Sequence, residues 1–392
     1  INPYKGIDVT GKIMVVLGGY PQGVSFQDFS GKRGVDFDTP TNYAEKHGAM
    51  AILYIPSIMM MTQWDKNKIR FVEDGGLKVV KFIPHDRQVP YIYLSGDAIA
   101  SLFQREKIGV LTMNVRSSAD SVAPFLFSLT KKVSVNISVT NDTETTQNIV
   151  ASLKGSDAAV KDEFVAFGAH YDHLGTGTPV NGDSIYNGAD DDGSGTAALL
   201  SIAETFAHGS RPKRSLLFVW HCAEEKGLWG SRYFTDNPTI PLNKIVTQLN
   251  IDMIGRSKPD TGAASHDEML TGRHEVFVIG SKMMSTDLGK LNEDINASFL
   301  KLSLNYKFDD PKDPLRLFFR SDHYNYAKHE IPIIFYFDGL HEDYHKVSDE
   351  VGKIDFEKYL NVTKTIFATG WTLANLPKRP AVDKKVEPIF EN

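Results

Sequence analysis

The sequence predicts an α/β protein whose larger part is a three-layer α/β/α domain around a mostly parallel sheet. Five apolar runs between residues 164 and 339 are continuous rather than alternating, as expected of strands buried on both faces of a parallel sheet. Segments with helical periodicity lie between these runs. The 392 residues are too many for one ordinary core, so we expect a second, smaller domain.

The composition is that of a globular protein, with 41% apolar residues and a net charge of -6. This charge gives no reason to expect nucleic acid or an anionic membrane surface as a partner. No apolar stretch reaches the length of a transmembrane helix, so we expect no membrane span. The oligomeric state stays open.

The cellular location is less constrained. Cys222 is the single cysteine, so the chain forms no internal disulfide, which neither requires nor excludes export. The first residue is Ile1 rather than Met, which either a cleaved signal peptide or trimming of the sequence would explain. We expect an extracytoplasmic protein, whether periplasmic, secreted or surface-anchored.

Residues 1–128 are predicted to form the smaller domain, a small α/β or open-barrel module. Short apolar strands are expected at residues 12–19, 49–56 and 89–95. Helices are expected at Pro40–His47 and at residues 96–107. The sequence of this region contains no cluster of histidines and acidic residues with the spacing of metal ligands.

Residues 129–392 are predicted to form the larger domain. Its expected buried strands are residues 164–170, 215–223, 246–255, 276–281 and 331–339. Alternating stretches at residues 131–139 and 148–156 predict edge strands. Ser194–His208 and Asp355–Ala374 have helical periodicity, and the polar segment 284–320 is predicted to be an insertion or rim.

Metal-binding side chains follow four of these strands. In open α/β sheets, ligands gather at the carboxyl ends of the strands, so side chains placed there are brought to one edge. A further aspartate precedes the Ser194 helix, in a loop with three glycines that permit a tight turn. The candidate ligands are His170, Asp191, Glu225, Asp252 and His345.

Two imidazoles and three carboxylates suit a pair of Zn²⁺ ions, which need one bridging carboxylate. We expect Asp191 to bridge, His170 and Asp252 to bind one ion, and His345 and Glu225 to bind the other. Glu224 is left over and is predicted to act as the general base on a water molecule. Each residue taken singly would be an ordinary loop residue, but the set indicates metal-assisted hydrolysis. The same donors also suit manganese or cobalt.

Three further residues are predicted to support the metal site, and purely structural roles are the alternative. Asp172 would orient the His170 imidazole or cap a turn, and Asp349 would support His345 in the same way. Tyr344 would stabilise an oxyanion or serve as a structural tyrosine. The remaining nearby residues are expected to be structural, and these are His173, His221, Cys222, His323 and His341.

The motifs that contain the candidate ligands are GAHYDHLG, NGADDDGSGTAALL, HCAEEKGLWGS, LNIDMIG and DYHKVSDE. In this order, over about residues 130–375, they resemble the co-catalytic dizinc aminopeptidase family of bacterial leucine aminopeptidases. The resemblance implies a phosphorylase/hydrolase-like peptidase domain, the five zinc ligands above, Glu224 as the base and peptides as substrates. It places the bridging role on Asp191, the middle residue of the triple aspartate. Residues 10–125 resemble the protease-associated domain that accompanies this family.

The leading interpretation is an aminopeptidase that removes N-terminal residues. A carboxypeptidase of the same fold would need a basic side chain for the substrate carboxylate, and Arg256, Arg316 and Arg320 are the candidates. A glutaminyl cyclase is a further alternative, although relatives of that kind typically use one zinc ion. A receptor-like binding module that has lost catalysis is the alternative from another class, because fold alone does not fix activity.

Overall fold

A computed structural model of the chain describes residues 8–19, 33–73, 77–82, 89–112, 126–128, 131–136, 138, 142–259 and 268–386, without the side chains of residues 69–73. The chain separates into a smaller unit, with residues up to 141, and a larger unit that begins at residue 142. The predicted boundary after residue 128 lies within the smaller unit, and as a functional division it stays a prediction.

The smaller unit contains a three-stranded parallel sheet in the order β1-β2-β3. Its elements are β1 (Ile13–Leu17), α1 (Pro40–Lys46), β2 (Ala51–Ile55), α2 (Ile58–Thr62), α3 (Trp64–Glu73), the 3-10 turn η2 (Val80–Phe82), β3 (Tyr91–Tyr93) and α4 (Gly96–Phe103). Thr39 caps α1 and Pro40 occupies its first turn, where a proline costs no hydrogen bond. The small α/β region is confirmed, and its identity as a protease-associated domain stays a prediction.

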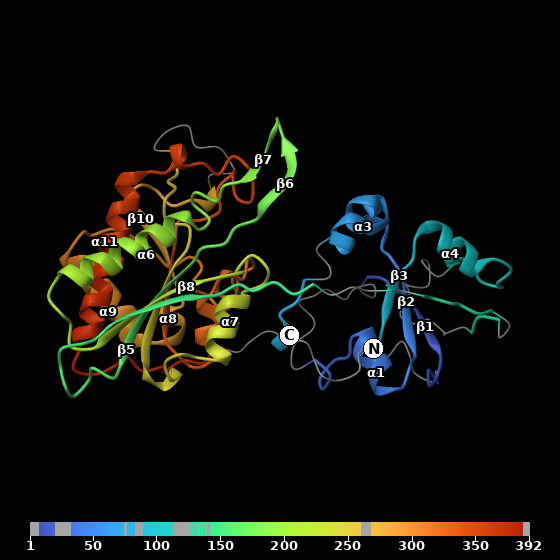
Figure 1. The fold of residues 1–392 in the computed structure, drawn as a ribbon, viewed down its shortest axis with the longest axis horizontal. Coiled ribbons are helices and arrows are strands. Elements are labelled where there is room, and N and C mark those ends of the chain that lie inside the picture. Colours follow the sequence, from blue (N-terminus) through green and yellow to red (C-terminus); the bar gives the residue numbers. More distant parts are fainter. Residues whose placement is uncertain are drawn as a thin grey trace. The chain divides into compact units, whose positions relative to one another are not determined.

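The larger unit is built on a seven-stranded sheet in the order β11-β10-β12-β9-β5-β8-β4 (Figure 1). The strands are β4 (Ile149–Leu153), β5 (Phe164–His170), β8 (Ser215–His221), β9 (Ile245–Ile251), β10 (Glu275–Ile279), β11 (Ser303–Asn305) and β12 (Ile333–Phe337). The four central strands β12, β9, β5 and β8 are parallel, whereas β4 and β10 run antiparallel to their inner neighbours. The sheet is therefore mixed and mostly parallel.

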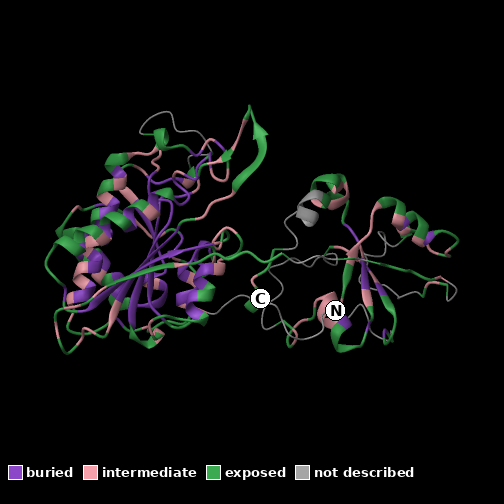
Figure 2. Cartoon of the chain, in the orientation of Figure 1, coloured by how far each residue is buried: buried purple, intermediate pink, exposed green. Residues whose placement is uncertain are grey.

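Helices cover both faces of this sheet. One face packs against α6 (Gly193–His208), α9 (Thr286–Ser298) and α11 (Phe356–Asn375), and the other against α7 (Trp229–Asp236), α8 (Ser281–Met284) and α10 (His323–Ala327). Along β5, Val165 and Phe167 join the first core and Ala166 joins the second. Figure 2 shows the sheet interior in the buried colour between two helical layers. The predicted three-layer α/β/α fold is confirmed.

The remaining elements are short. A hairpin of β6 (Gly175–Val180) and β7 (Asp183–Tyr186) extends from the larger unit. The 3-10 turns are η3 (Leu242–Lys244), η5 (Leu317–Phe319) and η6 (Val351–Lys353). None of the described helices is both long enough and apolar enough to cross a bilayer.

Two sequence predictions are wrong. The described residues 131–136 and 138 form no strand, and β4 alone forms that edge of the sheet. The polar segment 284–320 is not an insertion, since α9 buries Leu288 in the main core and β11 extends the sheet, although Leu317 and Arg320 at its end do line a pocket. The buried side chain of Asn292 on α9 accepts a hydrogen bond from Tyr336 Oη (2.7 Å), so this polar residue belongs to the buried face of the helix.

Candidate metal centre

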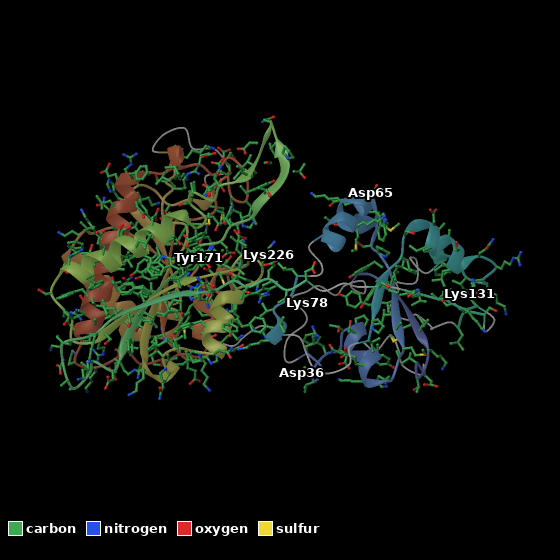
Figure 3. The ribbon with its side chains drawn as sticks, viewed as in Figure 1. Asp36, Asp65, Lys78, Lys131, Tyr171 and Lys226 are labelled. Carbon is green, nitrogen blue, oxygen red and sulfur yellow. The ribbon has the colours of Figure 1, made fainter. Side chains whose placement is uncertain are left out.

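The ends of the parallel strands deliver the predicted residues to one edge of the sheet. His170 is the last residue of β5 and Asp252 directly follows β9. Glu224 and Glu225 follow β8 after Ala223, which has a left-handed φ of 54°. Tyr171 and Lys226, labelled in Figure 3, directly follow His170 and Glu225 and mark where two of these loops leave the sheet.

The loop before α6 holds Asp191 in place through hydrogen bonds of the two aspartates on either side of it. Asp192 caps α6 by accepting from the Gly195 amide (2.8 Å), and it also accepts from the His170 amide (3.1 Å). Asp190 accepts from the Gly255 amide (2.7 Å). The outer aspartates of the triplet therefore join the loop to the sheet, and Asp191 in the middle is the one that faces the cluster.

The first group of ligand atoms comes from His170, Asp191 and Asp252. Nε2 of His170 lies 3.2 Å from Asp191 Oδ1 and 3.7 Å from Asp252 Oδ1. Nδ1 of the same ring lies 3.0 Å from the carbonyl oxygen of Asp172, which places the proton on Nδ1 and leaves the Nε2 lone pair toward the carboxylates. Within the described part of the chain, this buried Nε2 has no hydrogen-bond partner.

The second group lies on the other side of Asp191. Nε2 of His345 lies 3.2 Å from Asp191 Oδ2 and 3.2 Å from Glu225 Oε2. Nδ1 of His173 lies 2.8 Å from Glu225 Oε1. The two oxygens of Asp191 thus face opposite groups, which is the arrangement expected of a bridging carboxylate.

These donors fit divalent ions. The ligand atoms of His170, Asp191 and Asp252 lie within 4.8 Å of one another, and so do those of His173, Asp191 and Glu225. Two donors that bind one zinc ion at about 2.0–2.2 Å with tetrahedral angles lie roughly 3.3–3.6 Å apart. The nitrogen-to-oxygen separations of 3.2 and 3.7 Å around His170 and His345 are close to that range.

Glu224 lies beside the first group. Burial raises the pKa of its carboxyl well above the usual value; the charge of His170 opposes this, and the nearby carboxylates Asp322 and Asp252 add to it. Bound cations would favour the anion again. The Asp172 carboxylate accepts from the amides of Glu224 (3.0 Å) and Glu225 (3.3 Å) and so fixes the start of this loop.

Asp172 contacts the His170 ring and also holds a turn, in line with both of its predicted roles, whereas Asp349 acts differently from the prediction. The Asp172 group that orients the His170 ring is its carbonyl, while its carboxylate lies 3.8 Å from Nδ1. The Asp349 carboxylate accepts from the amides of Asp190 (3.0 Å) and Asp191 (3.2 Å). It thus holds the loop of the shared ligand, and no contact of Asp349 with His345 is recorded among the described residues.

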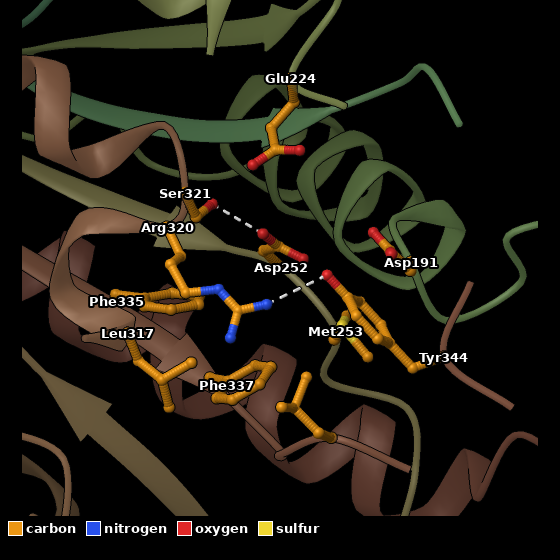
Figure 4. A pocket seen from close by; sticks show the side chains of 11 residues that line it. Asp191, Glu224, Asp252, Met253, Leu317, Arg320, Ser321, Phe335, Phe337 and Tyr344 are labelled. Atoms are coloured by element: carbon orange, nitrogen blue, oxygen red, sulfur yellow. Dashed lines mark hydrogen bonds between the residues drawn. The ribbon is translucent and has the colours of Figure 1, made fainter. Parts of the chain in front are cut away.

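A pocket opens beside the cluster (Figure 4). Asp191, Glu224 and Asp252 form one side of it, and apolar side chains that include Leu317, Phe335 and Phe337 form the other. Between them, Nη2 of Arg320 donates to the hydroxyl of Tyr344 (3.4 Å). The hydroxyl of Ser321 donates to Asp252 Oδ2 (2.6 Å). Tyr344 thus lines the pocket, and its role in stabilising an oxyanion stays a prediction, whereas Ser321 had no signal in the sequence.

The other nearby histidines have structural partners. His221 Nε2 lies 3.0 Å from the Tyr326 hydroxyl, and His341 Nε2 lies 3.2 Å from Asp190 Oδ2. Burial lowers the pKa of His323 to about 3, so its neutral ring, with Nε2 2.8 Å from the Phe318 carbonyl, cannot serve as a base at neutral pH. His173 alone departs from the expected structural role, because it joins the second ligand group.

Comparisons with known proteins identify the family of the larger unit. The family model "Peptidase family M28" matches residues 148–370, more than half of the chain. A probable zinc metalloprotease of Pyrenophora tritici-repentis is 27% identical over 59% of this chain and 58% of its own length. Leucine aminopeptidase 2 of Trichophyton equinum is 27% identical over 63% of this chain and 44% of its own length. The chain therefore spans about half the length of these curated relatives.

Solved structures support the fold alone. An aminopeptidase from Aneurinibacillus sp. strain AM-1 matches with a TM-score of 0.50 and 18% identity. The match covers 98% of this chain and 73% of the aminopeptidase. It is consistent with a peptidase-like α/β domain plus a small N-terminal α/β region.

Proposed function

The chain belongs to peptidase family M28, and on that premise we propose that it is a dizinc aminopeptidase that hydrolyses the N-terminal bond of peptides. The observation that carries the proposal is the convergence of two ligand groups on Asp191, directly beside Glu224 and a pocket. Similarity to leucine aminopeptidase 2 and to aminopeptidase Y of Saccharomyces cerevisiae supports the choice of bond.

His170, Asp191 and Asp252 would hold one ion, and Asp191, Glu225 and His345 the other. When bound, the ions would polarise the scissile carbonyl and lower the pKa of a water molecule. Glu224 accepts the proton of that water and returns it to the leaving amine. Burial raises the pKa of Tyr344, so its hydroxyl stays a neutral donor for the developing oxyanion.

The pocket indicates which part of a peptide it binds. The carboxylates of Glu224 and Asp252 favour the ammonium group of a free N-terminus. Leu317, Phe335 and Phe337 form an apolar wall suited to a large apolar side chain on the first residue. Peptides with Leu, Met or Phe at the N-terminus are thus the substrates that this site fits.

One observation favours a second candidate, a carboxypeptidase. Of the three arginines considered from sequence, Arg256 forms an ion pair with Asp343 (2.8 Å), while Arg320 lines the pocket and could bind a substrate carboxylate. A panel of aminoacyl amides compared with N-blocked peptides that have a free C-terminus separates the two. Turnover of only the N-blocked peptides would overturn the aminopeptidase proposal.

The catalytic role is tested with Glu224→Gln, which keeps the shape of the side chain and removes the base. We expect wild-type zinc content and a rate at least about a hundredfold lower on leucyl amides. An unchanged rate would contradict the assigned base. A wild-type protein with two bound ions and no hydrolytic activity would favour the receptor-like alternative, and a single bound ion would favour a glutaminyl cyclase. The extracytoplasmic location stays a prediction, which cell fractionation with immunodetection would test.

A further inference from the structure

His173 lies inside the second ligand group without a role assigned so far. Its Nδ1 is 2.8 Å from Glu225 Oε1 and 3.8 Å from Asp191 Oδ2, and its side chain is only 8% exposed. Its ring centroid is 5.9 Å from that of His345, at an interplanar angle of 70°. Two imidazoles and two carboxylates therefore surround the same small volume.

The ion pair between His173 and Glu225 accounts for this position only in part. Burial raises the pKa of Glu225 and the hydrogen bond from His173 lowers it, but that hydrogen bond is poorly aligned. Although Nδ1 of His173 and Oε1 of Glu225 are 2.8 Å apart, neither atom has a hydrogen-bond partner of acceptable geometry among the described residues. Nε2 of His173 has none there either. Buried polar atoms are rarely left unsatisfied, and a cation bound by both atoms would satisfy them once they move apart toward the roughly 3.3–3.6 Å that separates two zinc donors.

The ring is held in place by the loop of the shared ligand. Gly188 has a left-handed φ of 61°, and a Cβ at this position would lie 2.5 Å from Cγ of His173. The ring therefore packs directly on the backbone of the loop that leads to Asp191. Its closeness to the second group follows from packing and is not a chance rotamer of an exposed side chain.

We infer that His173 is a fourth protein ligand of the second ion, through Nδ1, together with Asp191, Glu225 and His345. The inference rests on the proposed function in requiring two bound ions. Four protein donors are typical of closed zinc sites, whereas three leave a position open for water or substrate. The ion at His345 is then the tightly held one, and the ion at His170 exchanges more readily and keeps the open position.

The test compares zinc binding by wild-type protein, His173→Ala and His173→Asn. The Asn amide can still donate a hydrogen bond to Glu225 but is a poor zinc ligand. Metal-free protein is titrated with Zn²⁺ against a competing chelator, and bound zinc is counted by elemental analysis. We expect two ions in the wild type, and in both variants one affinity lowered at least about tenfold. Wild-type affinities in both variants, or in His173→Asn alone, would overturn the inference.

A second measurement does not depend on the stability of these variants. In His173→Cys loaded with Co²⁺, a thiolate ligand would add a sulfur-to-cobalt charge-transfer band that the wild type lacks. No such band in protein that holds two cobalt ions would contradict the inference. His208→Ala, at the exposed end of α6, is the control for loss of an imidazole and should leave both affinities unchanged. A wild type that binds fewer than two ions would instead overturn the proposed function itself.

Discussion

The two ligand groups share Asp191 but are built in different ways. The first is deeply buried, with His170 1% exposed and Asp252 7% exposed, and both ligands stand at strand ends. The second is more open, with a His345 side chain 36% exposed in a loop well beyond the end of β12. Sheet hydrogen bonds position the first group, so the second must obtain its order from contacts between loops.

Those contacts converge on Asp343, just before His345. Its carboxylate accepts from Arg256 (2.8 Å), from the hydroxyl of Ser348 (2.6 Å) and from Lys353 (2.6 Å). The loop can thus hold His345 at a left-handed φ of 58° toward Asp191. The comparison indicates that sheet hydrogen bonds fix the backbone of a strand-end ligand, whereas a loop ligand depends on a charged network behind it.

The largest expected effect comes from the residue that the two groups share. Asp191→Asn should lose both ions together, because one oxygen faces each group. Elemental analysis should then find almost no zinc at concentrations that load the wild type. Leucyl amide hydrolysis should fall at least about a thousandfold, because bound metal contributes several kcal/mol to catalysis.

The control for Asp191→Asn is Asp294→Asn on the exposed face of α9, where the side chain is 62% exposed and its ion pair contributes little. That variant should retain zinc and activity. Loss of only one ion in Asp191→Asn would show that the groups are independent, which would contradict the bridging role.

The next effect is the pH dependence of zinc binding at the second group. Burial lowers the pKa of His345 in the metal-free protein, but the hydrogen bonds that its imidazole donates to the carboxylates of Asp191 and Glu225 outweigh this and raise the pKa to about 9. The proton must leave before the ion binds, so below pH 9 the affinity should weaken as pH falls, about tenfold per unit for this proton. Competition titrations across the neutral and alkaline range measure this slope.

The matched variant for the pH dependence is His345→Gln. Its zinc affinity should be weaker at every pH and depend on pH less steeply, by about one proton. An identical slope in wild type and variant would show that His345 does not compete with protons for the ion.

The first group is the part of the site that sequence reasoning describes best. His170 and Asp252 end continuous apolar runs, and the rule that parallel strands align their carboxyl ends brings such residues together. The middle position of Asp191 in the triplet agrees with its two-sided contacts. Sheet topology is enough to define the neighbours of His170 and Asp252, whereas the middle position of Asp191 follows from the resemblance to the peptidase family.

Sequence reasoning does not predict all the residues of the second group or the contacts that hold them. His173 lies three residues after His170, and that spacing was the one available signal of a further imidazole. Its ring is placed by the backbone of Gly188, a contact that no local pattern predicts. Likewise, Asp349 holds amides of the Asp191 loop rather than His345, because that pairing depends on how two distant loops pack.

The smallest effect tests the first group through a hydrogen bond behind its carboxylate. Asn250 on β9 donates to the Ser321 hydroxyl (2.9 Å), which donates to Asp252 Oδ2 (2.6 Å) and leaves Oδ1 toward His170. Ser321→Ala should lower the zinc affinity of the first group about tenfold, because such supporting hydrogen bonds orient the ligand. The affinity of the second group should stay unchanged. Ser257→Ala, which removes a similar bond to Asp355 (2.5 Å), should alter neither affinity. An equal loss of affinity for both ions in Ser321→Ala would mean that the two groups respond as one unit. Their different construction would then have no effect on zinc binding.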